Sequence, residues 1–157
     1  MADNDATIQR LYTAFAERDG DTMAGCYAPE ATFTDPVFVG LANGEPAAMW
    51  RMLAERAKDF RLELVEHSAS GPTGTARWIA HYTFAQTGRP VVNDVRSTFS
   101  FNDAGLIVEQ RDVFSFYAWS KQALGLPGLL MGWTPLLQKK VQGTARAGLK
   151  QFMSAGR

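Results

Sequence analysis

Ala31-Thr32-Phe33-Thr34-Asp35-Pro36-Val37 and Arg111-Asp112-Val113-Phe114 are the two stretches that decide the fold of this chain. Each places one carboxylate inside an apolar run with the character of a strand. A carboxylate among aromatic and β-branched neighbours is costly unless it is paired, hydrogen-bonded or protonated. The two stretches therefore predict an apolar pocket with Asp35 and Asp112 at its wall.

The flanking sequence predicts helices first and strands afterwards. Apolar residues at helical spacing indicate a helix over 4–18, capped by Asn4 or Asp5, a short helix over 22–27 closed by Pro29, and a third over 46–58. Strands are predicted over 31–35, 60–66, 75–86, 91–101 and 106–116. This order is typical of an α+β domain in which helices cover one face of a curved, mostly antiparallel sheet.

We divide the chain into a domain over residues 1–117 and a helical extension over 118–157. The extension begins with a helical turn or two over 119–124, is broken by Gly125, Pro127, Gly128 and Gly132, and ends in a helix over 135–153. We expect it to pack on the same domain or on a partner subunit. Its first segment, anchored by Trp119, is expected to close part of the pocket.

Composition is that of a soluble globular domain. The 157 residues are 46% hydrophobic and 20% charged, with zero formal net charge, so the chain as a whole has no bias toward nucleic acid. The N-terminus lacks the pattern of a signal peptide, and no apolar run is long enough to span a bilayer. We expect a cytoplasmic protein, without membrane span or nucleic-acid partner, in which the single Cys26 is an inert buried thiol.

Charge is unevenly distributed along the chain. Residues 1–60 carry ten acids and five bases, whereas the chain from Val113 onward carries six bases and no acid. The basic tail could contact a membrane surface or nucleic acid, or it could pack on the acidic body of its own or a neighbouring subunit. We favour the latter, because the basic residues form no dense run.

The segment from Leu11-Tyr12-Thr13-Ala14-Phe15 through Asp35-Pro36, with Gly44 before a helix and the later Arg-Asp-x-Phe string, resembles the nuclear-transport-factor-2-like superfamily. This superfamily includes ketosteroid isomerases, SnoaL-type polyketide cyclases and limonene-epoxide hydrolases. The resemblance covers about residues 5–117 and implies a cone, in which a bent sheet wraps around helices and encloses an apolar cavity. It also implies a homodimer formed through the outer face of the sheet.

Comparison with the isomerases assigns the general base to Asp35, in the Asp-Pro step after the first strand. Their oxyanion hole is formed by a tyrosine and by an aspartate that stays protonated and donates a hydrogen bond. Those positions fall on Leu11, with Tyr12 one residue away, and on Ser97. The base is thus retained and the oxyanion hole is not.

Comparison with the epoxide hydrolases assigns an acid/base role to Asp112, in the Arg-Asp-x-Phe string. Their catalytic arginine and second aspartate fall on Trp78 and Ala80, and their water-holding tyrosine and asparagine fall on Phe33 and Asp35. Of the two aspartates and the arginine that these hydrolases use, only the aspartate matched by Asp112 is therefore retained. The chain combines the isomerase base with the hydrolase acid/base group.

Alternation along the strands predicts the rest of the pocket wall. The expected substrate-binding residues are Trp78, Tyr82, Asn93, Ser97, Phe99 and Phe114. Asp35 and Asp112 could also share a proton, or serve only as a turn carboxylate and an ion-pair partner. With two histidines and no cluster at ligand spacing, we expect no metal site.

Three functions remain open at this point. The first is a cofactor-independent isomerase, cyclase or hydrolase acting on a small apolar substrate of steroid, terpenoid or polyketide type. The second is a non-catalytic binding module for a small hydrophobic ligand. The third is a dimerisation domain with a vestigial pocket.

Overall fold

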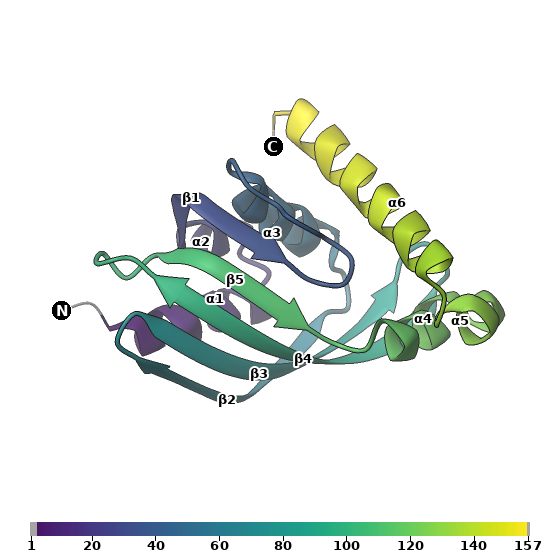
Figure 1. Cartoon of the computed structure of the whole chain (residues 1–157), viewed down its shortest axis with the longest axis horizontal. Coiled ribbons are helices and arrows are strands. Elements are labelled where there is room, and N and C mark those ends of the chain that lie inside the picture. Colours follow the sequence, from purple (N-terminus) through teal and green to yellow (C-terminus); the bar gives the residue numbers. More distant parts are fainter. Residues whose placement is uncertain (1–2, 157) are drawn as a thin grey trace.

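The computed structural model describes residues 3–156 and has five strands in one curved, open sheet. Helices α1, α2 and α3 lie against the concave side of the sheet, and α4, α5 and α6 follow the last strand (Figure 1). The strands are β1 (Tyr27–Thr34), β2 (Arg61–Ser70), β3 (Thr73–Phe84), β4 (Arg89–Phe101) and β5 (Ile107–Val113). The helices are α1 (Asn4–Ala16), α2 (Gly20–Ala24), α3 (Glu45–Arg56), α4 (Phe116–Leu124), α5 (Leu126–Met131) and α6 (Pro135–Ser154). The expected α+β class and mostly antiparallel sheet are confirmed.

The strand order β1-β5-β4-β3-β2 brings the two diagnostic stretches together. β1 pairs with β5 in parallel, and Thr34 is opposite Arg111. Asp35 is therefore the first residue after β1, beside Asp112, the next residue of β5. On the other side of β5, Ser97 of the antiparallel β4 is opposite Asp112. β5 thus carries Asp112 between Asp35 and Ser97.

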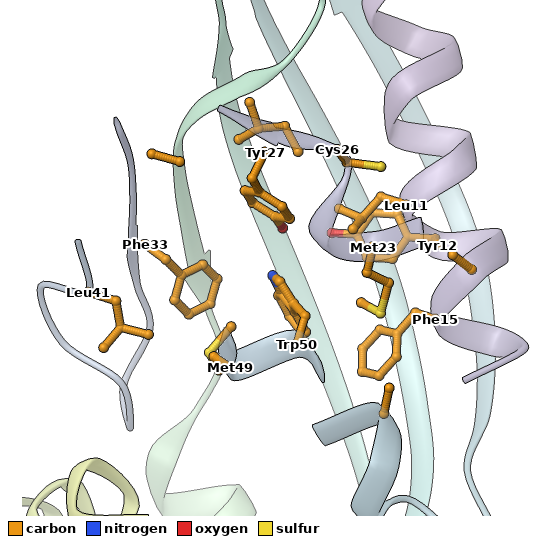
Figure 2. Close-up of a cluster of buried hydrophobic side chains, with 14 of the residues drawn as sticks. Leu11, Tyr12, Phe15, Met23, Cys26, Tyr27, Phe33, Leu41, Met49 and Trp50 are labelled. Carbon is orange, nitrogen blue, oxygen red and sulfur yellow. The ribbon is translucent and has the colours of Figure 1, made fainter. Parts of the chain in front are cut away.

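The concave side of the sheet is filled by large side chains from α1 and α3. Tyr12 and Phe15 of α1 and Met49 and Trp50 of α3 are buried there (Figure 2). Phe15 contacts Trp78 of β3 with ring centroids 5.7 Å apart. Because the α1 residues recur at helical spacing, one stripe of the helix faces the sheet and the other faces solvent.

Several predicted boundaries were wrong for identifiable reasons. The cap of α1 is Asp3, whose side chain accepts a hydrogen bond from the Ala6 amide, instead of Asn4 or Asp5. The second helix ends at Ala24, and β1 begins at Tyr27, so Pro29 lies within a strand. β1 is an edge strand with irregular pairing between Tyr27 and Thr32, and an edge or bulge tolerates the missing amide of proline.

The extension contains one more helix than expected. Glycine and proline predicted a break after residue 124, but Leu126–Met131 forms α5. A Cβ atom added to Gly128 would lie 1.9 Å from the Ser120 carbonyl oxygen, so glycine is required for α5 to pack on α4. The long helix α6 then returns along α3 (Figure 1).

Candidate functional site

Asp112 is the polar centre of the concave face. It is 4% exposed. Its Oδ1 atom accepts one hydrogen bond from Ser97 Oγ at 2.6 Å and one from Gln110 Nε2 at 2.9 Å. Its Oδ2 atom takes part in no hydrogen bond with residues 3–156. When Asp112 is protonated, the proton therefore belongs on Oδ2.

Ser97 links Asp112 to two aromatic side chains. Its Oγ atom accepts hydrogen bonds from Tyr12 OH and Trp78 Nε1, both at 2.9 Å, and donates its own proton to Asp112. Tyr12 comes from α1, Trp78 from β3 and Ser97 from β4. The three are buried, so this hydrogen-bonded junction fixes α1 against the sheet.

Gln110 extends the same network toward β1. Its amide oxygen accepts a hydrogen bond from Tyr27 OH while its amide nitrogen donates to Asp112. Gln110 is 1% exposed. Trp50 Nε1 points toward the Tyr27 hydroxyl (Figure 2), and this buried nitrogen donates no hydrogen bond within residues 3–156.

Asp35 lies in the turn after β1 and is partly buried. Its Oδ1 atom accepts hydrogen bonds from the amides of Val37 at 2.7 Å and Phe38 at 2.6 Å, an arrangement typical of aspartate in a turn. No hydrogen bond to Oδ2 is present in the described part of the chain. Oδ1 therefore acts as an ordinary turn carboxylate oxygen, whereas Oδ2 is available to bind another group.

Burial raises the pKa values of both carboxyls. Desolvation raises the pKa of Asp35 to about 6 against the opposing effect of the Phe38 and Val37 amides. Desolvation raises the pKa of Asp112 to about 7, opposed by hydrogen bonds from Ser97 and Gln110 and reinforced by the charge of Asp35. No hydrogen bond joins Asp35 to Asp112 within residues 3–156, so their influence on each other is through space.

The six predicted substrate-binding residues occupy different places. Trp78, Ser97 and Phe99 belong to the buried interior around Asp112, where their side chains pack on α1. Tyr82 and Phe114 are partly buried and contact both apolar clusters of the structure. Asn93 is partly buried on the face of β4 that also carries Ser97.

Tyr82 is hydrogen-bonded to the extension and is influenced by the charge of Asp35. Its hydroxyl accepts a hydrogen bond from Trp119 Nε1 at 2.8 Å, and Trp119 of α4 packs on Phe84 and Phe116. Burial raises the pKa of the Tyr82 phenol, and the charge of Asp35 adds to that increase. The expectation that Trp119 anchors the extension agrees with these contacts.

The last helix contacts the loop that carries Asp35. Gln138 Nε2 and Gln142 Nε2 of α6 each donate a hydrogen bond to the Pro36 carbonyl oxygen at 3.1 Å. Val141 packs beside Val37 in the apolar cluster formed by α4. Arg146 of α6 pairs with Glu45 of α3 at 3.6 Å, so part of the basic tail does pack on the acidic body.

Two surface pockets of the described chain lie outside the cone. One, of about 610 Å³, is lined by residues of α2, α3 and the end of α6; the other, of about 420 Å³, lies over α1 and α2. Within the cone, large apolar and aromatic side chains pack against one another (Figure 2). Asp35, Tyr82 and Phe114 are only partly buried, and we call this part of the fold the mouth of the cone.

Sequence reasoning missed three residues of the network. Tyr12 was set one residue away from the isomerase position, yet its hydroxyl reaches Ser97. Gln110 precedes Asp112 by two residues, so strand alternation could have placed both on one face. Tyr27 was assigned to a helix, and no signal in the sequence related it to Gln110.

Residues 3–156 contain no group of three histidine, cysteine, aspartate or glutamate residues arranged to hold a metal ion. In the same part of the chain, no helix combines the length and apolar character needed to cross a membrane. Cys26 is buried, and burial raises the pKa of its thiol.

A bent five-stranded sheet wrapped around N-terminal helices defines a nuclear-transport-factor-2-like fold. The profile of the SnoaL-like domain matches residues 8–110, and the chain belongs to that family. Helices α4, α5 and α6 lie beyond the matched region. None of the curated proteins matches the chain.

Solved structures share the fold at low sequence identity. A LEH-like epoxide hydrolase from M. tuberculosis is 20% identical with a TM-score of 0.63, and the match covers 85% of this chain and 94% of that one. A hypothetical protein from Catenulispora acidiphila with a ketosteroid isomerase-like fold, in complex with trimethylamine, is 14% identical with a TM-score of 0.66, and the match covers 82% of this chain and 97% of that one. IdmH from Streptomyces antibioticus, a proposed polyketide cyclase, is 20% identical with a TM-score of 0.62, covering 75% and 96%. The family match and these neighbours establish the fold that this chain shares with them.

Proposed function

We propose that the chain is a cofactor-independent enzyme that moves protons on a small, largely apolar substrate of steroid, terpenoid or polyketide type. The observation that carries this proposal is a pair of neighbouring carboxyls with raised pKa values, Asp35 just after β1 and Asp112 on β5. In each, Oδ1 accepts two hydrogen bonds and Oδ2 accepts none from residues 3–156. Isomerisation, cyclisation and hydrolysis can each use a positioned general base and a positioned general acid.

Asp35 is the base in this proposal. It is partly exposed at the mouth of the cone, and its lower pKa of about 6 leaves it mostly ionised at neutral pH. The two amides that hold Oδ1 orient the carboxylate, so Oδ2 faces the substrate. A proton taken from the substrate would go to that oxygen.

Asp112 is the acid, or the group that holds a water. Its pKa of about 7 keeps a substantial protonated fraction at neutral pH. The protonated Oδ2 would donate to a carbonyl or epoxide oxygen, while Ser97 and Gln110 keep Oδ1 in place. Tyr82, Asn93 and Phe114 would line the substrate at the mouth.

The test is turnover of a panel of enones, epoxides and polyketide intermediates by the protein and two variants. Asp35→Asn and Asp112→Asn should each lower kcat/KM by about 100-fold or more, since general acid–base groups contribute at least that much. Asp94→Asn is the matched control, because Asp94 is a surface carboxylate paired with Arg77 at 2.8 Å. Full activity of Asp35→Asn would contradict the proposal.

The pH profile gives an independent readout of the same mechanism. The value of kcat/KM should rise as pH increases through about 6, where Asp35 loses its proton, and fall above about 7, where Asp112 loses its proton. These are properties of the interacting pair, so each variant should remove one limb and displace the other.

Ligand binding without chemistry is the second candidate. The serine at position 97 favours it, because β4 places a hydroxyl and not a second carboxyl beside Asp112. Native mass spectrometry that finds a carried apolar ligand, with no product from any substrate of the panel, would support this function over catalysis.

A further inference from the structure

We propose that α5 and the start of α6 form a docking surface for an anionic lipid membrane. The surface is defined by six exposed apolar side chains that follow one another along the chain. Their exposed fractions are 64% for Leu126, 50% for Leu129, 61% for Leu130, 43% for Met131, 72% for Trp133 and 71% for Leu136. We call this set the α5 patch. It lies outside the proposed catalytic machinery.

The helix α5 is oriented opposite to an ordinary surface helix. Its small residue, Gly128, is buried against α4, and its leucines face outward. Gly132 also faces inward, because an added Cβ atom would lie 2.1 Å from Ser120 Oγ. A surface helix normally buries its large apolar side chains. Because the two glycines face inward, the apolar side chains of the α5 patch face outward, where they contact solvent or a partner.

The backbone of the patch is prepared for an apolar environment. The carbonyl oxygens at the end of a short helix usually rely on water. Here Tyr117 OH donates to Leu129 O at 3.1 Å, Trp133 Nε1 to Leu130 O at 3.0 Å, and the Thr134 hydroxyl to Met131 O at 2.6 Å. Satisfied carbonyls lower the cost of moving this segment out of water.

Charge identifies the partner as an anionic surface. Lys121, Lys139 and Lys140 are exposed around the patch, and α4, α5 and α6 contain no acidic residue. Long lysine side chains can lie beside an apolar face and extend their ammonium groups to lipid phosphates. Tryptophan beside leucine and lysine is typical of helices that lie in a membrane interface.

The same charges disfavour a second copy of the chain as the occupant. Two patches meeting face to face would bring the lysines of one copy toward the lysines of the other, with no acid on these helices to neutralise them. Nucleic acid is disfavoured because the centre of the surface is aliphatic. A bilayer with anionic headgroups can bury the apolar side chains of the α5 patch and pair its phosphates with the surrounding lysines.

The full chain should be mixed with vesicles of phosphatidylcholine alone and with an equal mixture of phosphatidylcholine and phosphatidylglycerol. We expect cosedimentation with the mixed vesicles, weakened by added salt. Trp133 reports the contact directly, because Trp50, Trp78 and Trp119 are 3%, 6% and 5% exposed. Its emission should shift to shorter wavelength and be quenched by brominated lipid, and Trp133→Phe should abolish that change.

Leu130→Glu should weaken partition into the mixed vesicles at least tenfold, while Val65→Glu, on β2 and 42% exposed, should leave it unchanged. The double substitution Lys139→Gln and Lys140→Gln should also weaken partition into the mixed vesicles, by about fivefold for each lysine replaced. Far-ultraviolet circular dichroism checks that each variant is folded.

Three outcomes would overturn the proposal. These are no binding to either vesicle, equal binding of the protein and Leu130→Glu, and equal binding to neutral and mixed vesicles. Self-association that Leu130→Glu abolishes, without vesicle binding, would also overturn it and assign the patch to a second copy.

Discussion

Burial makes the protonation state of Asp112 a determinant of stability, because desolvation outweighs the hydrogen bonds from Ser97 and Gln110 that favour its charged form. Its pKa rises to about 7 on folding, so between its unfolded value and pH 7 the folded chain binds more protons than the unfolded chain. Stability should therefore decrease as pH rises through this range. A shift of about three pKa units corresponds to roughly 4 kcal/mol.

The substitution Asp112→Asn should remove this pH dependence. The asparagine oxygen can still accept from Ser97 and Gln110, and no charge has to be buried. We expect the variant to be more stable than the unaltered chain at pH 8 and nearly equal at pH 5, measured by urea denaturation. Asp94→Asn should instead make the protein less stable than the unaltered chain at pH 8, because the hydrogen-bonded Arg77 lowers the pKa of Asp94 and stabilises its charged form.

Ser97→Ala tests the hydrogen-bonded junction. The change removes a partner from Tyr12, Trp78 and Asp112 together, and each buried polar group left without a partner costs about 1–3 kcal/mol. We expect a loss of about 2–4 kcal/mol in the free energy of unfolding. Ser100→Ala on the same strand is the control and should change it by less than about 0.5 kcal/mol.

The residue-level predictions from sequence succeeded where one residue was unusual in its own surroundings. Asp35 and Asp112 stood out because each is a charge in an apolar run. Tyr12 and Gln110 did not stand out, because a tyrosine on an apolar helix face and a glutamine in a strand are ordinary. Tyr12 acquires its role through Ser97 of β4, and Gln110 acquires its role through Tyr27 and Asp112.

At the level of elements, alternation and helical spacing predicted all five strands and the helices of the domain to within a few residues. α5 was missed because glycine and proline normally end helices. The structure uses glycine there for close approach to α4, which depends on a residue eight positions earlier in the chain. Local propensity carries no information on such a contact.

Gly128→Ala should separate α5 from α4. The added methyl group would overlap the Ser120 backbone, so we expect a loss of about 1–3 kcal/mol in unfolding free energy and faster amide exchange in α4 and α5. Gly143→Ala is the matched control in α6. Its Cβ atom would meet nothing within 4 Å, so the helix should gain about 0.5–1 kcal/mol. Equal effects of the two changes would contradict the packing described for α5.

For the whole molecule, we propose that the outer face of the sheet forms a homodimer, as the resemblance implies. Val92 and Val113 are 49% and 59% exposed on that face, next to the Arg77–Asp94 pair. Sedimentation velocity at micromolar concentration should give twice the 17.3 kDa mass of one chain. Val113→Glu should shift the protein to monomer, while Val39→Glu, at a residue 51% exposed in the loop after β1, should not. A monomeric wild-type chain would contradict this assembly.

The two glutamines that hold the Pro36 carbonyl have a consequence for the order of events during synthesis. The loop around Asp35 leaves the ribosome early, but its final hydrogen bonds come from Gln138 and Gln142, more than a hundred positions later. A nascent chain that already holds the whole sheet therefore still lacks the two hydrogen bonds that α6 donates to this loop. Proton chemistry at Asp35 should begin only once residue 142 has emerged and α6 has docked.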